Sequence, residues 1–318
     1  MSYSLSTLKD IIIPAAREEL LPRFTRVERQ HKRDGSVITE ADLATQSRIA
    51  GELQANWPNT VFLGEEMEAA EQASLLESKQ PVWCLDPLDG TSNFAAGIPF
   101  FCVSLALLQG GKVVLGIIYD PVRDECFSAD ATTGAQLNGE PLRVKQSDLA
   151  LAQTTALIDF KRLAPPLATR LVSEIPYASQ RSFGSVALDW CWLAAGRCHV
   201  YLHGRSKLWD YSAGNYIFHQ AGGHSCSHDG KPVFTHALTP RSSVAAVDEA
   251  PMAEWPAWLG SPVNEAASSV WFPVDAACSR DRARKALLHH GSGVARLLGR
   301  AAHPERHVLV EKLLPGHV

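Results

Sequence analysis

The chain of 318 residues is 46% hydrophobic and 20% charged, a balance that is ordinary for a folded globular protein and excludes a disordered chain. Its apolar runs, such as residues 100–108, are too short to cross a bilayer, and no basic segment followed by an apolar one begins at Met1, so we expect neither a membrane span nor a secretory signal. The seven cysteines are scattered without a Cys-x-x-Cys pair, which favours a reducing, cytoplasmic location over a disulfide framework or a structural zinc site. The net charge of −4 gives no reason to expect a nucleic-acid partner.

Charge is distributed unevenly along the chain. From Trp271 onward there are eight Lys or Arg residues against four acidic ones, so this segment carries +4 and the rest of the chain −8. We therefore predict a basic, partly helical extension over residues 263–318, distinct from the preceding body of the protein.

The N-terminal part of the chain predicts two helices joined by a polar connection. Apolar side chains recur on one face at the helical period over residues 5–20, and Pro14 should kink or break this helix. A basic, polar stretch over residues 23–35 indicates an exposed loop or hairpin. A second helix is predicted over residues 40–55, with Thr39 as its N-cap.

The next part of the chain indicates β-structure. Short strands are predicted over residues 61–63 and 82–85. Residues 101–108 and 112–119 flank a Gln-Gly-Gly turn and should form an antiparallel hairpin, and Asn138-Gly139 marks another turn.

The second half alternates strands with helices. The predicted strands cover residues 154–158, 199–202 and 243–247, and the predicted helices cover residues 186–195 and 212–221. Antiparallel pairing early in the chain and alternation later predict a mixed α/β (α+β) fold of layered sheets and helices. We place a boundary near Asp148, with a first half over residues 1–148 and a second over residues 149–262.

One segment concentrates residues suited to metal and phosphate chemistry. Asp86-Pro87-Leu88-Asp89-Gly90-Thr91-Ser92 directly follows a short apolar strand. Two carboxylates three residues apart can converge on a hard cation, and oxygen ligands favour Mg²⁺ or Mn²⁺ over zinc. The Gly-Thr-Ser that follows offers consecutive N–H groups for a phosphate. The structural alternative is a proline turn followed by a capped helix.

Three further strings add acids at the ends of predicted elements. Gly64-Glu65-Glu66 follows a strand, and Trp209-Asp210, with Ala213-Gly214 after it, lies near a helix start. The third string runs from Lys32 through Ser36 and Thr39 to Asp42. Each string alone is compatible with an ordinary solvated surface or a helix cap.

Together and in this order, the four strings resemble the inositol monophosphatase family of metal-dependent phosphatases, over roughly residues 5–250. The Asp-Pro-hydrophobic-Asp-Gly-Thr loop is the hallmark of the family, and Val37 departs from its usual proline. The resemblance implies a layered α-β-α-β-α sandwich of the sugar-phosphatase type and hydrolysis of a phosphate monoester.

The resemblance also implies the metal ligands. Glu65, Asp86 and the main-chain carbonyl of Leu88 would hold one Mg²⁺, and Asp86, Asp89 and Asp210 a second. A third, weaker ion would share Glu65, so the cofactor is two to three Mg²⁺ ions.

The same resemblance assigns the catalytic and phosphate-binding groups. Asp42 and Thr91 would orient the attacking water, with Glu65 counted among the catalytic residues through its metal. The N–H groups of Gly90, Thr91 and Ser92 would bind phosphate. The sequence-adjacent Cys84 is expected to be a buried core thiol, because the loop lacks the arginine signature of a cysteine phosphatase.

The residues that would contact the alcohol are Asp89, Gly184, Ser185, His203 and Lys32. Inositol-specific members resemble one another in placing a glutamate seven residues before the Trp-Asp aspartate, where this chain has His203. With Arg205 and Lys207 nearby, this rim would be basic and could attract a second phosphate; alternatively, these three side chains simply face solvent.

The substrate alternatives therefore remain open. An inositol-phosphate-like monoester ranks first and a 3′(2′),5′-bisphosphate nucleotide second, with other sugar phosphates and histidinol phosphate behind them. A non-enzymatic alternative is a protein that binds the transcription machinery through the basic extension. By the same resemblance, a homodimer is expected.

Overall fold

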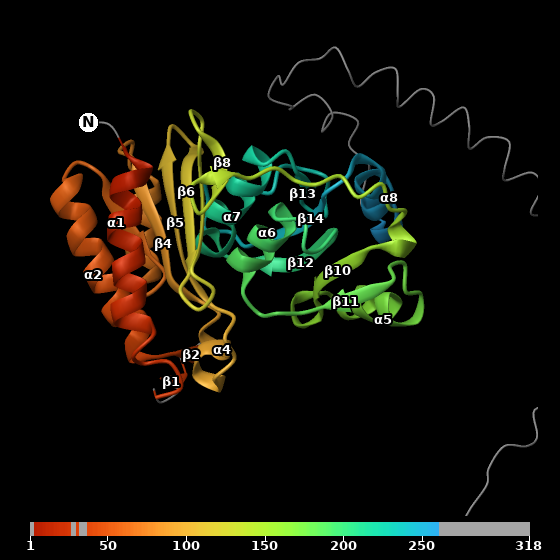
Figure 1. The fold of residues 1–318 in the computed structure, drawn as a ribbon, viewed down its shortest axis with the longest axis horizontal. Coiled ribbons are helices and arrows are strands. Elements are labelled where there is room, and N and C mark those ends of the chain that lie inside the picture. Colours follow the sequence, from red (N-terminus) through yellow and green to blue (C-terminus); the bar gives the residue numbers. More distant parts are fainter. Residues whose placement is uncertain (1–2, 27–29, 32–36, 261–318) are drawn as a thin grey trace, which may run out of the picture. The chain divides into compact units, whose positions relative to one another are not determined.

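Two helices, α6 (Val186–Ala194) and α7 (Leu208–Gln220), lie between two β-sheets in the computed structural model (Figure 1). The structure describes residues 3–26, 30–31 and 37–260. The predicted basic extension over residues 263–318 and Lys32 lie outside these residues.

The first sheet has seven strands in the order β3-β4-β5-β6-β7-β8-β9. Only its β3–β4 pair is parallel; every other neighbouring pair is antiparallel. The predicted hairpin and the Asn138-Gly139 turn are both confirmed, and the turn residues have the positive φ angles, 52° and 86°, that a tight hairpin requires. The strands are β3 (Val61–Gly64), β4 (Val82–Asp89), β5 (Cys102–Gln109), β6 (Lys112–Asp120), β7 (Glu125–Asp130), β8 (Gly134–Leu137) and β9 (Glu140–Pro141).

Two N-terminal helices cover the outer face of this sheet (Figure 1). The predicted first helix is confirmed as α1 (Leu5–Ala15) and a π-helical turn (Ala16–Leu20) that begins two residues after Pro14, since proline cannot donate the usual helical hydrogen bond. The predicted second helix is α2 (Glu40–Asn56), capped by Thr39. Short elements complete this half: β1 (Gln30–His31), β2 (Val37–Ile38), α3 (Ala69–Leu76) and α4 (Thr91–Ala96).

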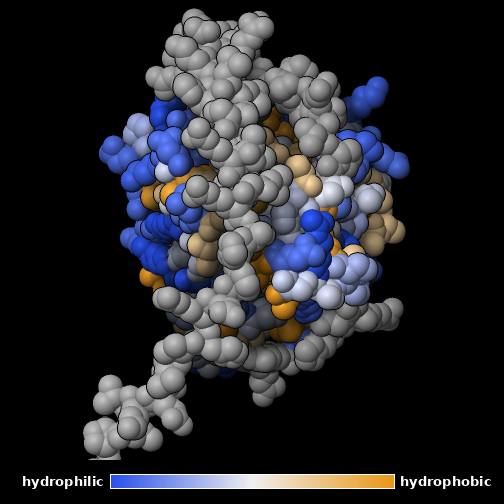
Figure 2. All heavy atoms as spheres, turned by 90° about the vertical axis from the view of Figure 1, so that its right-hand side faces the viewer, coloured by the Kyte–Doolittle hydropathy of each residue, from blue (hydrophilic) through white to orange (hydrophobic). Residues whose placement is uncertain are grey.

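The second sheet has five strands in the order β11-β10-β12-β14-β13. Its outer face packs against α5 (Pro165–Ser173) and α8 (Glu249–Leu259). The strands and short helices are β10 (Thr155–Asp159), β11 (Ser179–Arg181), β12 (Val200–Ser206), β13 (His224–Cys226), β14 (Arg241–Ala246), η2 (Leu151–Gln153) and η3 (Phe160–Arg162). Where the described surface is visible in Figure 2, hydrophobic residues form spots among hydrophilic ones.

The predicted layered, mixed α/β architecture is thus confirmed, with helices, a sheet, helices, a sheet and helices following one another. A single apolar core unites the inner faces of both sheets with α6 and α7. Three predicted elements differ in extent by about four residues: β4, α7 and β12, which continues to Ser206 instead of ending at Leu202. The strand from Val82 continues to Asp89, and α7 begins at Leu208, because Asp210 caps the helix by accepting the N–H of Lys207 at 2.7 Å.

Candidate functional site

The Asp86–Ser92 segment forms the end of β4, beside β5, and then leaves the first sheet to start α4. Asp86 pairs with Ser104 and Asp89 with Cys102, so one extra residue on β4 forms a bulge between them. At Gly90 the chain adopts a φ of +98°, and an added Cβ would lie 2.8 Å from the carbonyl oxygen of Phe100. Only glycine suits this position, where the strand gives way to α4.

Asp89 connects the first sheet to the start of α6. Its Oδ2 accepts hydrogen bonds from the hydroxyl of Ser185 at 2.7 Å and from the N–H of Ala187 at 2.6 Å. The side chain is buried, and this burial raises the pKa of Asp89 to about 6, although the Ser185 and Ala187 bonds act in the opposite direction. The structure therefore brings Ser185, a sequence-predicted substrate residue, into direct contact with a predicted metal ligand.

Asp86 and Asp210 are the most strongly perturbed acids of the site. Burial is the first cause that raises the pKa of each well above its ordinary value, and the charges of Glu65 and Asp89 come next for both. Local N–H groups hold one oxygen of each side chain: Leu88 donates to Asp86 at 3.0 Å and Lys207 to Asp210 at 2.7 Å. Each carboxylate is thereby held in place from one side.

Glu65 directly follows β3, and hydrogen bonds of the main chain at Gly64 and Glu65 hold this residue in position. Its N–H donates to the carbonyl of Leu85 at 3.0 Å, and the side-chain amide of Gln72 donates to the carbonyl of Gly64 at 2.8 Å. The ammonium of Lys207 lies 3.7 Å from Glu65 Oε1 and above the ring of Trp209. The first turn of α7 therefore supplies both an acid, Asp210, and a cation to the same region.

Asp42 and Thr91, to which the resemblance assigns the attacking water, are in contact with each other. Thr91 Oγ1 lies 3.1 Å from Asp42 Oδ1 and 2.9 Å from the carbonyl oxygen of Leu88. The second oxygen of Asp42 accepts the N–H and the hydroxyl of Thr39 in a capping box. Burial, opposed by the Thr39 bonds, raises the pKa of Asp42 to about 6.

These acids fit a divalent cation by their chemistry and electrostatics. They present carboxylate oxygens, which hard cations such as Mg²⁺ prefer, and the elevated pKa values of Asp86 and Asp210 report buried negative charge that a cation would stabilise. Among the described residues, no three Asp, Glu, His or Cys side chains are drawn into a closed ligand cluster.

Asn93 is a site residue that the sequence analysis missed. From α4 its amide donates to the carbonyl oxygens of Phe100 at 2.8 Å and Phe183 at 2.6 Å. Gly184 follows with a φ of +82°, and an added Cβ there would lie 3.3 Å from the Asn93 amide. Asn93 thus fixes the loop that carries Gly184 and Ser185. The sequence signal that could have identified Asn93 is its position directly after the Asp86–Ser92 segment.

The sequence analysis left open whether His203 belongs to a basic rim or faces solvent, and the second alternative is wrong for this residue. The side chain is 3% exposed, and its Nε2 lies 3.2 Å from Asp159 Oδ2, because the two residues are directly opposed in the parallel β10–β12 pair. Arg205 is exposed, and Lys207 lies beside Glu65. The three basic side chains therefore do not form one cationic patch.

The cysteine near the hallmark loop is a buried thiol. Burial and the nearby Asp210 and Asp86 raise the pKa of Cys84. It therefore stays protonated and cannot act as a thiolate nucleophile.

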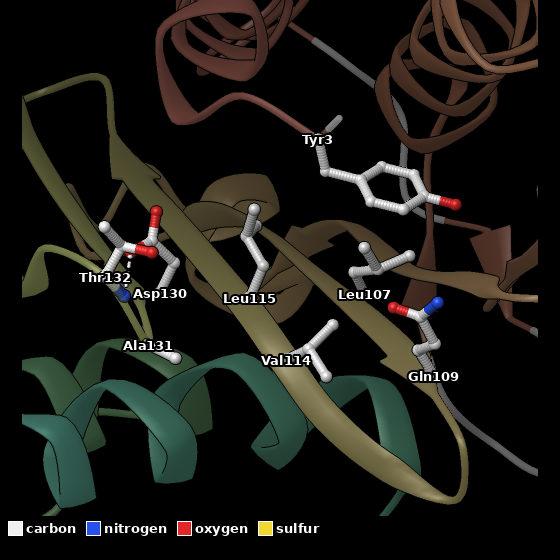
Figure 3. Close-up of a pocket in the computed structure, with 8 residues that line it drawn as sticks. All are labelled: Tyr3, Leu107, Gln109, Val114, Leu115, Asp130, Ala131 and Thr132. Carbon is white, nitrogen blue, oxygen red and sulfur yellow. Dashed lines mark hydrogen bonds between the residues drawn. The ribbon is translucent and has the colours of Figure 1, made fainter. Parts of the chain in front are cut away.

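A cavity of about 330 Å³ lies away from the acids of the candidate site (Figure 3). Leu107 and Gln109 line it at the end of β5 opposite to Cys102, which pairs with Asp89. Figure 3 shows Tyr3 on one side of this cavity and Asp130 and Thr132 on the other. None of the predicted site residues lines it.

Comparison with known proteins identifies the family. The inositol monophosphatase family matches residues 3–256. Inositol monophosphatase 1 of Solanum lycopersicum is 38% identical over 61% of this chain and 72% of its own length, and Nus factor SuhB of Pasteurella multocida is 36% identical over 63% and 74%. A solved Thermotoga maritima IMPase superposes with a TM-score of 0.69 at 26% identity, covering 80% of this chain and 96% of that one. The chain therefore belongs to the inositol monophosphatase family, and it is a phosphoric monoester hydrolase of that type.

Proposed function

We propose that this protein is a Mg²⁺-dependent hydrolase of the phosphate monoester of a hydroxyl-rich alcohol, with inositol 1-phosphate as the first candidate. The observation that carries the proposal is the convergence of buried acids from separate elements. The charge of Glu65 raises the pKa of Asp86, Asp89 and Asp210, and the charge of Asp89 also raises the pKa of the other two.

In this proposal Glu65, Asp86, Asp89, Asp210 and the carbonyl of Leu88 hold two Mg²⁺ ions, and a third, weaker ion shares Glu65. When bound, such ions neutralise phosphate charge and lower the pKa of water.

The protein's own groups then position the reactants. Asp42 and Thr91, whose side-chain oxygens lie 3.1 Å apart, would orient the attacking water on the phosphorus. The N–H groups of Gly90, Thr91 and Ser92 would hold the phosphate oxygens for in-line displacement. No covalent nucleophile is required.

The charge distribution supports ranking a monophosphate above a bisphosphate. Two of the three cationic candidates for a second phosphate lie beside an acid, since Asp159 faces His203 at 3.2 Å and Glu65 faces Lys207 at 3.7 Å. The name of the tomato relative supports the inositol class for the alcohol. A 3′(2′),5′-bisphosphate nucleotide remains the second candidate, followed by other sugar phosphates and histidinol phosphate.

Phosphate release with Mg²⁺ tests the proposal. The panel compares inositol 1-phosphate, adenosine 3′,5′-bisphosphate, fructose 1,6-bisphosphate and histidinol phosphate by kcat/KM. We expect inositol 1-phosphate to lead by more than about tenfold, EDTA to abolish turnover, and Mg²⁺ but not Zn²⁺ to restore it. Full activity in excess EDTA would overturn the metal mechanism, and a tenfold lead for the nucleotide would overturn the substrate ranking.

One relative supports a second candidate function. Because the Pasteurella relative is named a Nus factor, binding to the transcription machinery is the alternative if no ester of the panel is hydrolysed while Mg²⁺ still binds. We also propose a cytoplasmic homodimer, for which sedimentation should give twice the 34.6 kDa chain mass. Within the described residues, no helix is long and apolar enough to span a membrane.

A further inference from the structure

The candidate site contains a cation that belongs to the chain itself. The ammonium of Lys207 lies 3.7 Å from Glu65 Oε1 and 5.3 Å from the centre of the Trp209 ring. A lysine ammonium is attracted both by a carboxylate and by the face of an indole ring, so the two contacts hold it in the same place. The side chain of Lys207 is 39% exposed and that of Glu65 is 14% exposed. The cation therefore reaches the acid from the solvent side.

The main chain fixes the position of the residue that carries this ammonium. The N–H of Lys207 donates to Asp210 Oδ2 at 2.7 Å at the start of α7. Lys207 thus contacts two of the proposed metal ligands, Asp210 through its main chain and Glu65 through its side chain. Because the main-chain hydrogen bond does not depend on the side chain, a substitution at position 207 can remove the ammonium and leave the N–H that holds Asp210.

Glu65 is the acid of the site at which a nearby cation has the widest effect. Its charge contributes to the raised pKa of four other acids, Asp42, Asp86, Asp89 and Asp210. The charge of Lys207 acts in the opposite direction, since it lowers the pKa of Asp210. The ammonium therefore offsets part of the negative charge that the site gathers around Glu65.

We propose that Lys207 competes with the third Mg²⁺ ion for Glu65 and thereby limits the protein to two tightly held ions. A carboxylate paired with an ammonium binds a further cation less strongly, because the two positive charges repel each other. The third ion has to displace the ammonium, which the flexible, partly exposed stem of lysine allows. In the proposed function Asp86 serves both principal ions, so these depend less on Glu65 than the third ion does. This inference rests on the proposed function and adds the group that weakens the third ion.

Calorimetric titration of the full chain with Mg²⁺, without substrate, tests this competition. Lys207→Met removes the charge and keeps an unbranched side chain beside Trp209, and we expect its weakest Mg²⁺ site to bind at least about tenfold more tightly than in wild type. Lys207→Gln repeats the charge removal with a polar side chain, and Lys207→Arg keeps the charge and should stay within about threefold of wild type. Lys231→Met is the matched control, because Lys231 forms an exposed pair with Asp229 at 3.0 Å. This change should leave every Mg²⁺ affinity within about twofold.

Bound Mn²⁺, counted by the loss of the electron paramagnetic resonance signal of the free ion, gives a second readout. At a Mn²⁺ concentration where wild type holds two ions, Lys207→Met should hold three. A weakest site that stays within about twofold of wild type in Lys207→Met and Lys207→Gln, or that tightens equally in Lys207→Arg, would overturn the competition. If Mg²⁺ binds but no ester of the panel is hydrolysed, the proposed function is wrong, and the titration alone decides the role of Lys207. If Mg²⁺ binds neither wild type nor the variants, both proposals are wrong.

Discussion

Individual side chains in the site are held by donors that belong to different parts of the fold. Asp89 accepts from Ser185 and Ala187, residues nearly a hundred positions later in the chain, whereas Asp42 accepts from its neighbour Thr39. Hydrogen bonds to a charged carboxylate hold it more firmly than contacts with water alone would. The protein alone therefore holds these two carboxylates in fixed positions.

Two substitutions separate metal binding from water positioning. Asp86→Asn should weaken Mg²⁺ binding by more than about tenfold and abolish turnover, because the proposal gives this carboxylate to both principal ions. Thr91→Ala should lower kcat by about a hundredfold, in the range of a lost positioning group, and keep Mg²⁺ affinity within about threefold. Calorimetric titration and the Mg²⁺ dependence of kcat measure both effects. Equal losses of Mg²⁺ affinity in the two variants would contradict the assigned roles.

The raised pKa of Asp42 predicts a pH-dependent cost in metal-free protein. Its pKa moves from 3.8 to about 6 on folding, so between these values the folded state binds more protons than the unfolded state. The contribution of Asp42 to stability is complete below pH 3.8 and is lost as the pH rises through about 6, on the order of 2–3 kcal/mol. Urea unfolding in EDTA should therefore show Asp42→Asn gaining stability relative to wild type between pH 4.5 and pH 7. A stability difference that is constant over this range would argue against a raised pKa.

At the scale of elements, the contact between α6 and α7 positions two parts of the site. The N-terminal end of α6 holds Asp89, and the first turn of α7 carries Asp210. The helices approach closely at Gly214, where an added Cβ would lie 2.6 Å from the Cβ of Trp190. The close spacing of the two helices therefore depends on Gly214 having no side chain.

Gly214→Ala should separate α6 from α7. Overpacking of a buried contact typically costs about 1–3 kcal/mol, and we expect a lower free energy of unfolding together with weaker Mg²⁺ binding, since Asp210 would move. Gly51→Ala is the matched control, because Gly51 lies on α2 with no atom within 4 Å of an added Cβ. That change should stabilise the protein by up to about 1 kcal/mol through helix propensity. Denaturant unfolding distinguishes the two, and a neutral Gly214→Ala would show that the helices can adjust.

At the scale of the described body of the protein, both sheets share one core. Leu63 and Ile118 of the first sheet and Leu157 and Ala245 of the second belong to the same apolar cluster, with α6 and α7 between them. Breaking either half would expose the inner helices, so their stability is coupled.

This shared core predicts cooperative unfolding of the two halves that the sequence analysis divided near Asp148. Far-ultraviolet and near-ultraviolet circular dichroism should report one coincident transition in denaturant. The tryptophans of the core, including Trp190, make the near-ultraviolet signal sensitive to the central layer. Two separated transitions would show that the halves are independent domains.

The sequence by itself determined several of the elements and the residue types of the candidate site. Local signals sufficed for α2, which begins at a Thr39 cap, for the β5–β6 hairpin and for the Asp86–Ser92 loop, because propensity, capping and turn chemistry act over a few residues. The order of four strings was enough to indicate the family. Only the tertiary structure decided which side chains from distant parts of the chain contact each other. It paired His203 with Asp159 and brought Ser185 to Asp89. Burial and long-range pairing set these contacts, and neither can be read from the neighbours of a residue in the chain.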